Sequence, residues 1–186
     1  MQKTPYTDSY LSALVLKYQQ HPKATDIHTV LYDLFHLSPP QEQGLYLEQF
    51  CTAALTNAYA WKQGAPANAI DYGHQLELLT EVAWLLYKKG KYNKKEQRAT
   101  REAIELPMPL TTAEYLQPQL YLQQFFAYTP LHQWKQYIAA FTVNAVSNES
   151  VTDELPGAVV LAFASYMNKL IYAVYRMAVL KGVGLR

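Results

Sequence analysis

The sequence of 186 residues contains a single cysteine, Cys51, which is the first of several scarcities. One cysteine excludes intramolecular disulfide bonds and zinc sites built from several thiolates. Cys51 falls in register with an apolar helical stripe and has no basic neighbour that would lower its pKa. We therefore expect it to behave as a small buried hydrophobic side chain rather than as a nucleophile.

Glycine and catalytic motifs are also scarce. The chain has seven glycines, mostly at expected helix ends, which leaves little material for a nucleotide-binding loop. It contains no phosphate-binding glycine loop, no Gly-x-Ser-x-Gly nucleophile elbow and no His-Glu-x-x-His zinc motif. Catalytic residues that are far apart in the sequence can still come together in the folded protein. The absence of these motifs nevertheless removes any positive reason to propose an enzyme. We favour a non-enzymatic function and expect no cofactor.

Charged residues amount to only 17% of the chain, whereas half of its residues are apolar. This composition is typical of a globular protein, not of a disordered segment or a coiled coil. The N-terminus lacks the basic leader and unbroken apolar core of a signal peptide. The most apolar segment, residues 157–180, is interrupted by Lys169 and Arg176, which favours a buried helix over a membrane span. We expect a soluble cytoplasmic protein with no membrane partner.

Large aromatic side chains, in contrast, are abundant. The chain has 16 Tyr, 6 Phe and 3 Trp, enough to fill an interior with rings. Tyrosine buries a large ring and keeps one end hydrated, so it suits the boundary between core and surface. A chain of this length closes a real hydrophobic core. We therefore expect residues 1–186 to form a single domain.

An all-α fold is predicted, because apolar residues recur with helical spacing nearly everywhere and no segment alternates convincingly as a strand does. Proline, glycine and capping residues divide the pattern into about seven or eight helices of one bundle. The last helix is apolar most of the way round, which places it near the middle of the bundle. The expected helices cover approximately residues 8–20, 25–34, 40–63, 69–89, 93–106, 120–128, 131–146 and 156–180.

Local signals add finer predictions for the C-terminal half. Thr111 and Glu114 have the spacing of a capping box, and Pro118 breaks or kinks the segment that follows. The helices expected at residues 120–128 and 131–146 read as an antiparallel pair hinged at a Thr-Pro step. The last helix carries one polar stripe, made of Ser165, Asn168, Lys169, Tyr172 and Arg176.

Two short segments of the chain recur. LYLEQF at 45–50 returns as LYLQQF at 120–125, and WKQ at 61–63 returns at 134–136. The common spacing of 73 to 75 residues is that expected of a duplicated helix pair. The alternative is coincidence in a chain rich in Leu, Tyr and Gln, because the rest of the two halves does not align.

His74, Glu77 and Glu81 fall within about 60° of one another on the helix expected at 69–89, opposite its apolar stripe. Such residues can bind a metal, but a carboxylate-bridged site in a bundle needs a Glu-x-x-His pair, which the sequence lacks. A solvated polar face is the favoured interpretation, and no metal site is predicted. Trp84 continues this face, and an exposed tryptophan is more typical of packing against another helix or subunit.

Residues 88–101 hold seven of the sixteen Lys and Arg but one of the fifteen Asp and Glu, so this stretch carries +6 and the remainder −5. Lys94 and Lys95 occupy the first turn of an expected helix, where the macrodipole disfavours cations. We favour a solvated corner, with contact to an acidic protein surface or to nucleic acid as alternatives. The candidate polyanion- or partner-binding residues are Lys88, Lys89, Lys91, Tyr92, Lys94, Lys95, Arg98 and Arg101.

An acidic counterpart exists in Glu149, Asp153 and Glu154, which could meet the basic stretch within one molecule or across a symmetric dimer. The leading hypothesis is a non-enzymatic helical module that acts through a protein partner or through self-association as a homo-oligomer. The alternative is nucleic-acid binding through residues 88–101, with an affinity that falls steeply with salt. A second alternative is a small-molecule or metal-dependent enzyme with a site between helices near His74 and Glu81.

Overall fold

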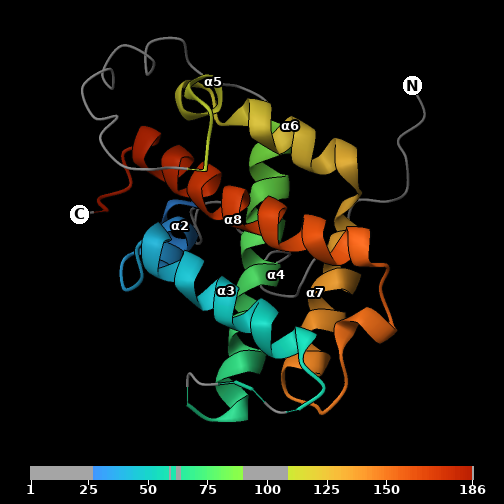
Figure 1. Cartoon of the computed structure of the whole chain (residues 1–186). Helices are drawn as coiled ribbons and strands as arrows, with labels where there is room; N and C mark the ends of the chain where they lie inside the picture. The colour runs from blue at the N-terminus through green and yellow to red at the C-terminus, as the bar shows by residue number, and fades with distance from the viewer. Residues whose placement is uncertain (1–26, 59, 62–63, 90–108, 186) are drawn as a thin grey trace.

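The computed structural model describes residues 27–58, 60–61, 64–89 and 109–185. Within these ranges the protein has seven α-helices, one short 3-10 helix and no strand, so the predicted all-α fold is confirmed (Figure 1). The elements are α2 (Ile27–Phe35), α3 (Pro40–Leu55), α4 (Pro66–Lys89), α5 (Thr112–Leu116), α6 (Gln119–Tyr128), α7 (Leu131–Ala145), η2 (Val151–Asp153) and α8 (Gly157–Leu180).

Most predicted boundaries agree with the structure. The ends of α4, α6, α7 and α8 lie within three residues of those expected from the sequence. The capping box of α5 is confirmed, because the Thr111 amide donates to Glu114 Oε2 at 2.7 Å and the Glu114 amide donates to Thr111 Oγ1 at 3.3 Å. Pro118 separates α5 from α6 as expected. The helices expected at residues 8–20 and 93–106 lie outside the described part of the chain.

The last helix, α8, lies in the middle of the bundle, as predicted (Figure 1). It contacts α2, α3, α4, α5, α6 and η2, and most of its side chains beyond Phe163 are buried. Its first turns are the exception, since Leu161 is 79% exposed. The predicted polar stripe is divided by this packing, because Ser165 stays exposed whereas Tyr172 and Arg176 are buried.

The third helix, α3, ends earlier than the sequence indicates. It was expected to continue to about residue 63, but it ends at Leu55. Thr56 takes an extended backbone, and its hydroxyl donates to the Ala53 carbonyl at 2.9 Å. The chain then returns toward the helix and places the Trp61 ring edge-on against Phe50, with the ring centroids 6.4 Å apart. Burial of two large rings against each other stabilises this return more than further helical turns in solvent would.

The helices α6 and α7 form a corner instead of the expected antiparallel pair. The chain turns at Thr129 and Pro130, and from there α6 packs against α4 and α8 while α7 packs against α3 and α4 (Figure 1). At the corner the rings of Phe125 and Trp134 stack with centroids 4.2 Å apart, and the Trp134 indole donates to the Phe125 carbonyl at 3.2 Å. The main neighbours of α6 are therefore α4 and α8, and those of α7 are α3 and α4.

The helices α4 and α7 pack closely against each other at Gly73. A methyl group added to this glycine would lie 2.2 Å from Thr142 Oγ1 and 3.1 Å from Thr142 Cβ. The Thr142 hydroxyl donates to the Ile138 carbonyl at 2.7 Å, which fixes the side chain against its own helix. The two backbones approach this closely because residue 73 has no side chain.

The recurring segments occupy related places. LYLEQF lies within α3 and LYLQQF begins α6, and the final phenylalanine of each, Phe50 and Phe125, is fully buried against a tryptophan that follows it. The tryptophans differ, however, because Trp61 lies in a loop and Trp134 in a helix. Internal duplication stays a prediction.

Two buried carboxylates are paired with lysines on other helices. Glu81 of α4 is fully buried and accepts from Lys135 Nζ of α7 at 2.6 Å. Glu114 of α5 is also buried and accepts from Lys169 Nζ of α8 at 2.9 Å. Burial raises the pKa of Glu114, but the hydrogen bonds from Lys169 and Thr111 outweigh burial, so the net effect is a pKa below its usual value.

The lowered pKa of Glu114 predicts a loss of stability in acid. A carboxyl group whose pKa is lower in the folded state stabilises the protein above the pKa of the unfolded chain, and this contribution disappears as the pH falls through the folded value. We expect the Glu114→Gln variant to be less stable than the natural protein at neutral pH, and the difference in stability to shrink as the pH falls and Glu114 becomes protonated in the folded state. Urea unfolding from neutral to acid pH measures the difference, and parallel curves for the two proteins would contradict the prediction.

Candidate functional site

The basic stretch is described only at its start. The backbones of Lys88 and Lys89 belong to the last turn of α4, and the Lys88 ammonium lies 4.3 Å from the centre of the Trp84 ring and 5.8 Å from that of Tyr87. This contact is a cation–π interaction, and it holds the lysine against the surface of the protein. The remaining candidates lie outside the described residues, so their role stays a prediction: Lys91, Tyr92, Lys94, Lys95, Arg98 and Arg101.

The acidic residues that were expected to face this stretch lie around η2. Glu149, Asp153 and Glu154 are all exposed. Glu154 accepts from the Asn144 side-chain amide at 3.1 Å. Whether they face the basic stretch depends on residues outside the described ranges, so this pairing stays a prediction as well.

The candidate metal ligands of α4 do not share one solvated face. His74 is exposed and Glu77 partly exposed, but Glu81 is fully buried against Lys135. The expectation that Glu81 faces solvent was wrong, because α7 covers this side of α4. Across the part of the chain that the structure describes, no three His, Cys, Asp or Glu side chains gather as metal ligands would. An enzyme site near His74 and Glu81 receives no support from this arrangement.

Two further predictions on single side chains are confirmed. Trp84 packs against another helix, with its ring edge-on to Phe126 of α6 at a centroid distance of 5.0 Å. Cys51 is a buried hydrophobic residue of α3. Burial raises the pKa of the Cys51 thiol to about 12, so the thiolate needed for nucleophilic chemistry is suppressed.

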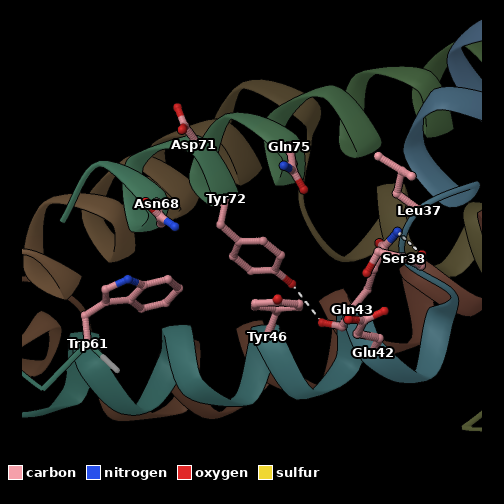
Figure 2. Close-up of a pocket in the computed structure, with 10 residues that line it drawn as sticks. All are labelled: Leu37, Ser38, Glu42, Gln43, Tyr46, Trp61, Asn68, Asp71, Tyr72 and Gln75. Carbon is pink, nitrogen blue, oxygen red and sulfur yellow. Dashed lines mark hydrogen bonds between the residues drawn. The ribbon is translucent and has the colours of Figure 1, made fainter. Parts of the chain in front are cut away.

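A pocket opens between α3 and α4, and we call it the α3–α4 pocket. It encloses about 400 Å³ and is closed at one end by the loop between α2 and α3 and at the other by Trp61 (Figure 2). Its wall combines aromatic rings, side-chain amides and two carboxylates. The lining residues are Leu37, Ser38, Glu42, Gln43, Tyr46, Trp61, Asn68, Asp71, Tyr72 and Gln75.

Hydrogen bonds fix the centre of this pocket. The Tyr72 hydroxyl reaches across from α4 and donates to the Gln43 carbonyl of α3 at 3.0 Å (Figure 2). The Gln43 side chain donates in turn to the carbonyls of Leu34 at 2.6 Å and Ser38 at 3.0 Å, which ties the α2–α3 loop to α3. Burial raises the pKa of the Tyr72 phenol, so this side chain stays neutral.

Two polar atoms of the pocket wall have no hydrogen-bond partner among the described residues. They are the indole nitrogen of Trp61, a residue only 4% exposed, and the hydroxyl oxygen of Ser38. Buried donors are nearly always paired in native proteins, and those left unpaired often belong to sites that bind water or a ligand. This pocket was not predicted from the sequence, because the expected third helix included Trp61 and therefore left no loop to carry it.

A shallow groove lies on the other side of α3, between α3 and α8, and we call it the α3–α8 groove. It measures about 530 Å³. Leu161 precedes the lining residue Ser165 by one helical turn and so lies on the same side of α8. The lining residues are Gly44, Leu47, Glu48, Cys51, Thr52, Leu55, Pro109, Ala164, Ser165, Asn168 and Lys169.

Comparison with known proteins assigns no function to the α3–α4 pocket or to the α3–α8 groove. No protein-family model, curated protein or solved structure matches the chain. Among the described helices, α8 is long and apolar enough to cross a membrane by length and composition, a test that the core helix of a soluble protein also passes.

Proposed function

We propose that the protein is a non-enzymatic helical module that works by protein contact, and that it associates with a second copy of itself through the α3–α8 groove. The observation that carries this proposal is the shape of one face. It has a hollow lined by small side chains beside a leucine that protrudes into solvent, Leu161 at 79% exposure. A two-fold dimer brings the same patch of both copies together, so the patch must be complementary to itself.

Several of the residues that line the groove are small. Gly44 approaches α8 so closely that an added methyl group would lie 3.3 Å from Asn168 Oδ1, and Ala164 and Ser165 have short side chains. Short side chains on the lining let a leucine from a second copy approach α3 and α8 more closely than long ones would. Leu55, which is 42% exposed, continues the apolar surface at the edge of the hollow.

The edges of the groove carry opposite charges. Glu48 of α3 is exposed, and Lys169 of α8 remains partly exposed despite its contact with Glu114. In a symmetric pair, opposite charges on one patch fix the register of the two copies and contribute little to affinity. Burial of the Leu161 side chain from each copy supplies the larger part, about 1.5 to 3 kcal/mol for each leucine.

The proposal predicts that Leu161→Lys abolishes self-association. Both copies lose an apolar anchor and place a charge in the apolar interface, so dimer affinity falls by roughly a hundredfold or more. Sedimentation equilibrium over a series of protein concentrations measures this. The natural protein should show a mass above the 21.3 kDa of the monomer, and the Leu161→Lys variant should not.

Val143→Lys is the matched control, because Val143 is a 56% exposed aliphatic residue of α7 that does not line the groove. This variant should associate like the natural protein. A natural protein that stays monomeric at every concentration overturns the proposal. Equal loss of association in both variants would show that the interface lies elsewhere.

A further inference from the structure

The α3–α4 pocket has the features of a built binding site, although the proposed self-association does not use it. Its walls come from α3, α4, the α2–α3 loop and the loop that carries Trp61 (Figure 2). Trp61 lines the cavity, and its buried indole N–H has no partner among the described residues. An acceptor atom of a ligand in the cavity would satisfy this donor, and such polar groups orient ligands in otherwise apolar pockets.

The charge of the wall selects the ligand. Glu42 and Asp71 both line the pocket, and none of the ten described lining residues is basic. Glu42 lies beside Gln43 on the α3 wall, whereas Asp71 sits at the rim with its carboxylate pointing away from Tyr72 (Figure 2). Two carboxylates without a basic partner on the wall attract a cation and repel an anion.

The aromatic rings reinforce this selection. Tyr46 and Tyr72 lie on facing helices with their ring centroids 6.0 Å apart, and Trp61 closes one end of the cavity. Because the Tyr72 hydroxyl is already bonded to Gln43, this residue offers a ligand its ring more than its oxygen. The faces of tyrosine and tryptophan attract ammonium groups, most strongly where water is excluded.

From these three features we propose that the α3–α4 pocket binds a small organic cation that also carries a hydrogen-bond acceptor. The acceptor meets the Trp61 N–H, the ammonium group meets the rings and Glu42, and the Ser38 hydroxyl supplies a further polar contact. A volume of about 400 Å³ suits a single small molecule rather than a peptide segment.

The indole signals in a proton–nitrogen NMR spectrum test this directly, because the chain has three tryptophans. The probes are tyramine and choline as cations, with tyrosol and 4-hydroxyphenylacetate as neutral and anionic analogues of tyramine. We expect at least one cation to shift the Trp61 signal, while the Trp134 signal stays in place because its N–H is already bonded to the Phe125 carbonyl. The two analogues should have little effect.

Variants on α3 identify the charge that matters. Glu42→Gln should weaken binding of the cation roughly threefold to tenfold, as expected for one partly hydrated carboxylate beside aromatic faces. Glu48→Gln is the matched control, because Glu48 is exposed on the same helix but lines the α3–α8 groove. Trp61→Phe keeps a ring and removes the donor, so it should lower affinity about fivefold when binding is measured by isothermal titration calorimetry. Thermal melts confirm that each variant is folded.

Two results would overturn the inference. One is that neither cation shifts the Trp61 signal at about 10 mM, well above a millimolar Kd. The other is that tyrosol or 4-hydroxyphenylacetate shifts it as strongly as tyramine, or that Glu42→Gln and Glu48→Gln have equal effects. Repeating the titration with Leu161→Lys separates the two proposals, because cation binding in that variant should be unchanged.

Discussion

Replacement of Gly73 by alanine is expected to lower the free energy of unfolding by about 2 kcal/mol, although alanine is the better helix former by about 1 kcal/mol. The new methyl group would lie 2.2 Å from Thr142 Oγ1, and the threonine cannot move away cheaply because it is branched at Cβ and bonded to the Ile138 carbonyl. The helices α4 and α7 must therefore separate. Urea denaturation followed by far-UV circular dichroism measures the change.

Two further variants show whether the clash is the cause. Thr142→Ala in the Gly73→Ala background removes the two nearest atoms and leaves Cβ at 3.1 Å, so most of the lost stability should return. Gly157→Ala serves as the control, because an added methyl group at the start of α8 would meet nothing within 4 Å. Its stability should be unchanged or slightly higher. A Gly73→Ala protein as stable as the natural one would show that α4 and α7 are less tightly apposed than described.

Lys135→Met should destabilise the protein by about 3 to 4 kcal/mol at neutral pH. The substitution keeps the apolar stem of the side chain but removes the ammonium group 2.6 Å from Glu81. Since Glu81 is fully buried, its charge is left in the interior without this lysine, which costs more than the original pair contributes. Chemical denaturation is again the measurement.

The double variant Glu81→Met with Lys135→Met distinguishes the effect of the charges from the effect of side-chain volume at these two positions. Removing both charges also removes the desolvation penalty, so the double variant should regain most of the stability that Lys135→Met loses. Equal destabilisation in the single and double variants would contradict this account. The stability would then depend on the volume or the further contacts of the two side chains rather than on their charges.

The parts of the fold that were predicted correctly depend on short-range signals. The capping box at Thr111 and Glu114 and the break at Pro118 involve residues within one or two turns of each other. The central place of α8 followed from apolar residues around most of its circumference. Such features depend on residues that are close together in the sequence, so they can be predicted without knowing which helices pack against each other.

The parts that were missed depend on contacts between distant residues. Trp61 lies outside the expected helix, where its ring packs against the buried ring of Phe50. Glu81 is buried and paired with Lys135, which lies 54 residues further along the chain. The α3–α4 pocket required both the early end of α3 and the link between Tyr72 and Gln43. Helical periodicity places residues around one axis, but it carries no information on which neighbouring helix each side will face.

The sixteen residues of α3 contribute to the α3–α4 pocket, to the α3–α8 groove and to the interior of the protein, so few of its positions face solvent alone. One side contributes Glu42, Gln43 and Tyr46 to the pocket, and the opposite side contributes Gly44 and Glu48 to the groove. Between them the helix supplies buried residues to the interior. On the two proposals made above, a substitution in α3 that suits the pocket also has to be tolerated by the groove and by the interior.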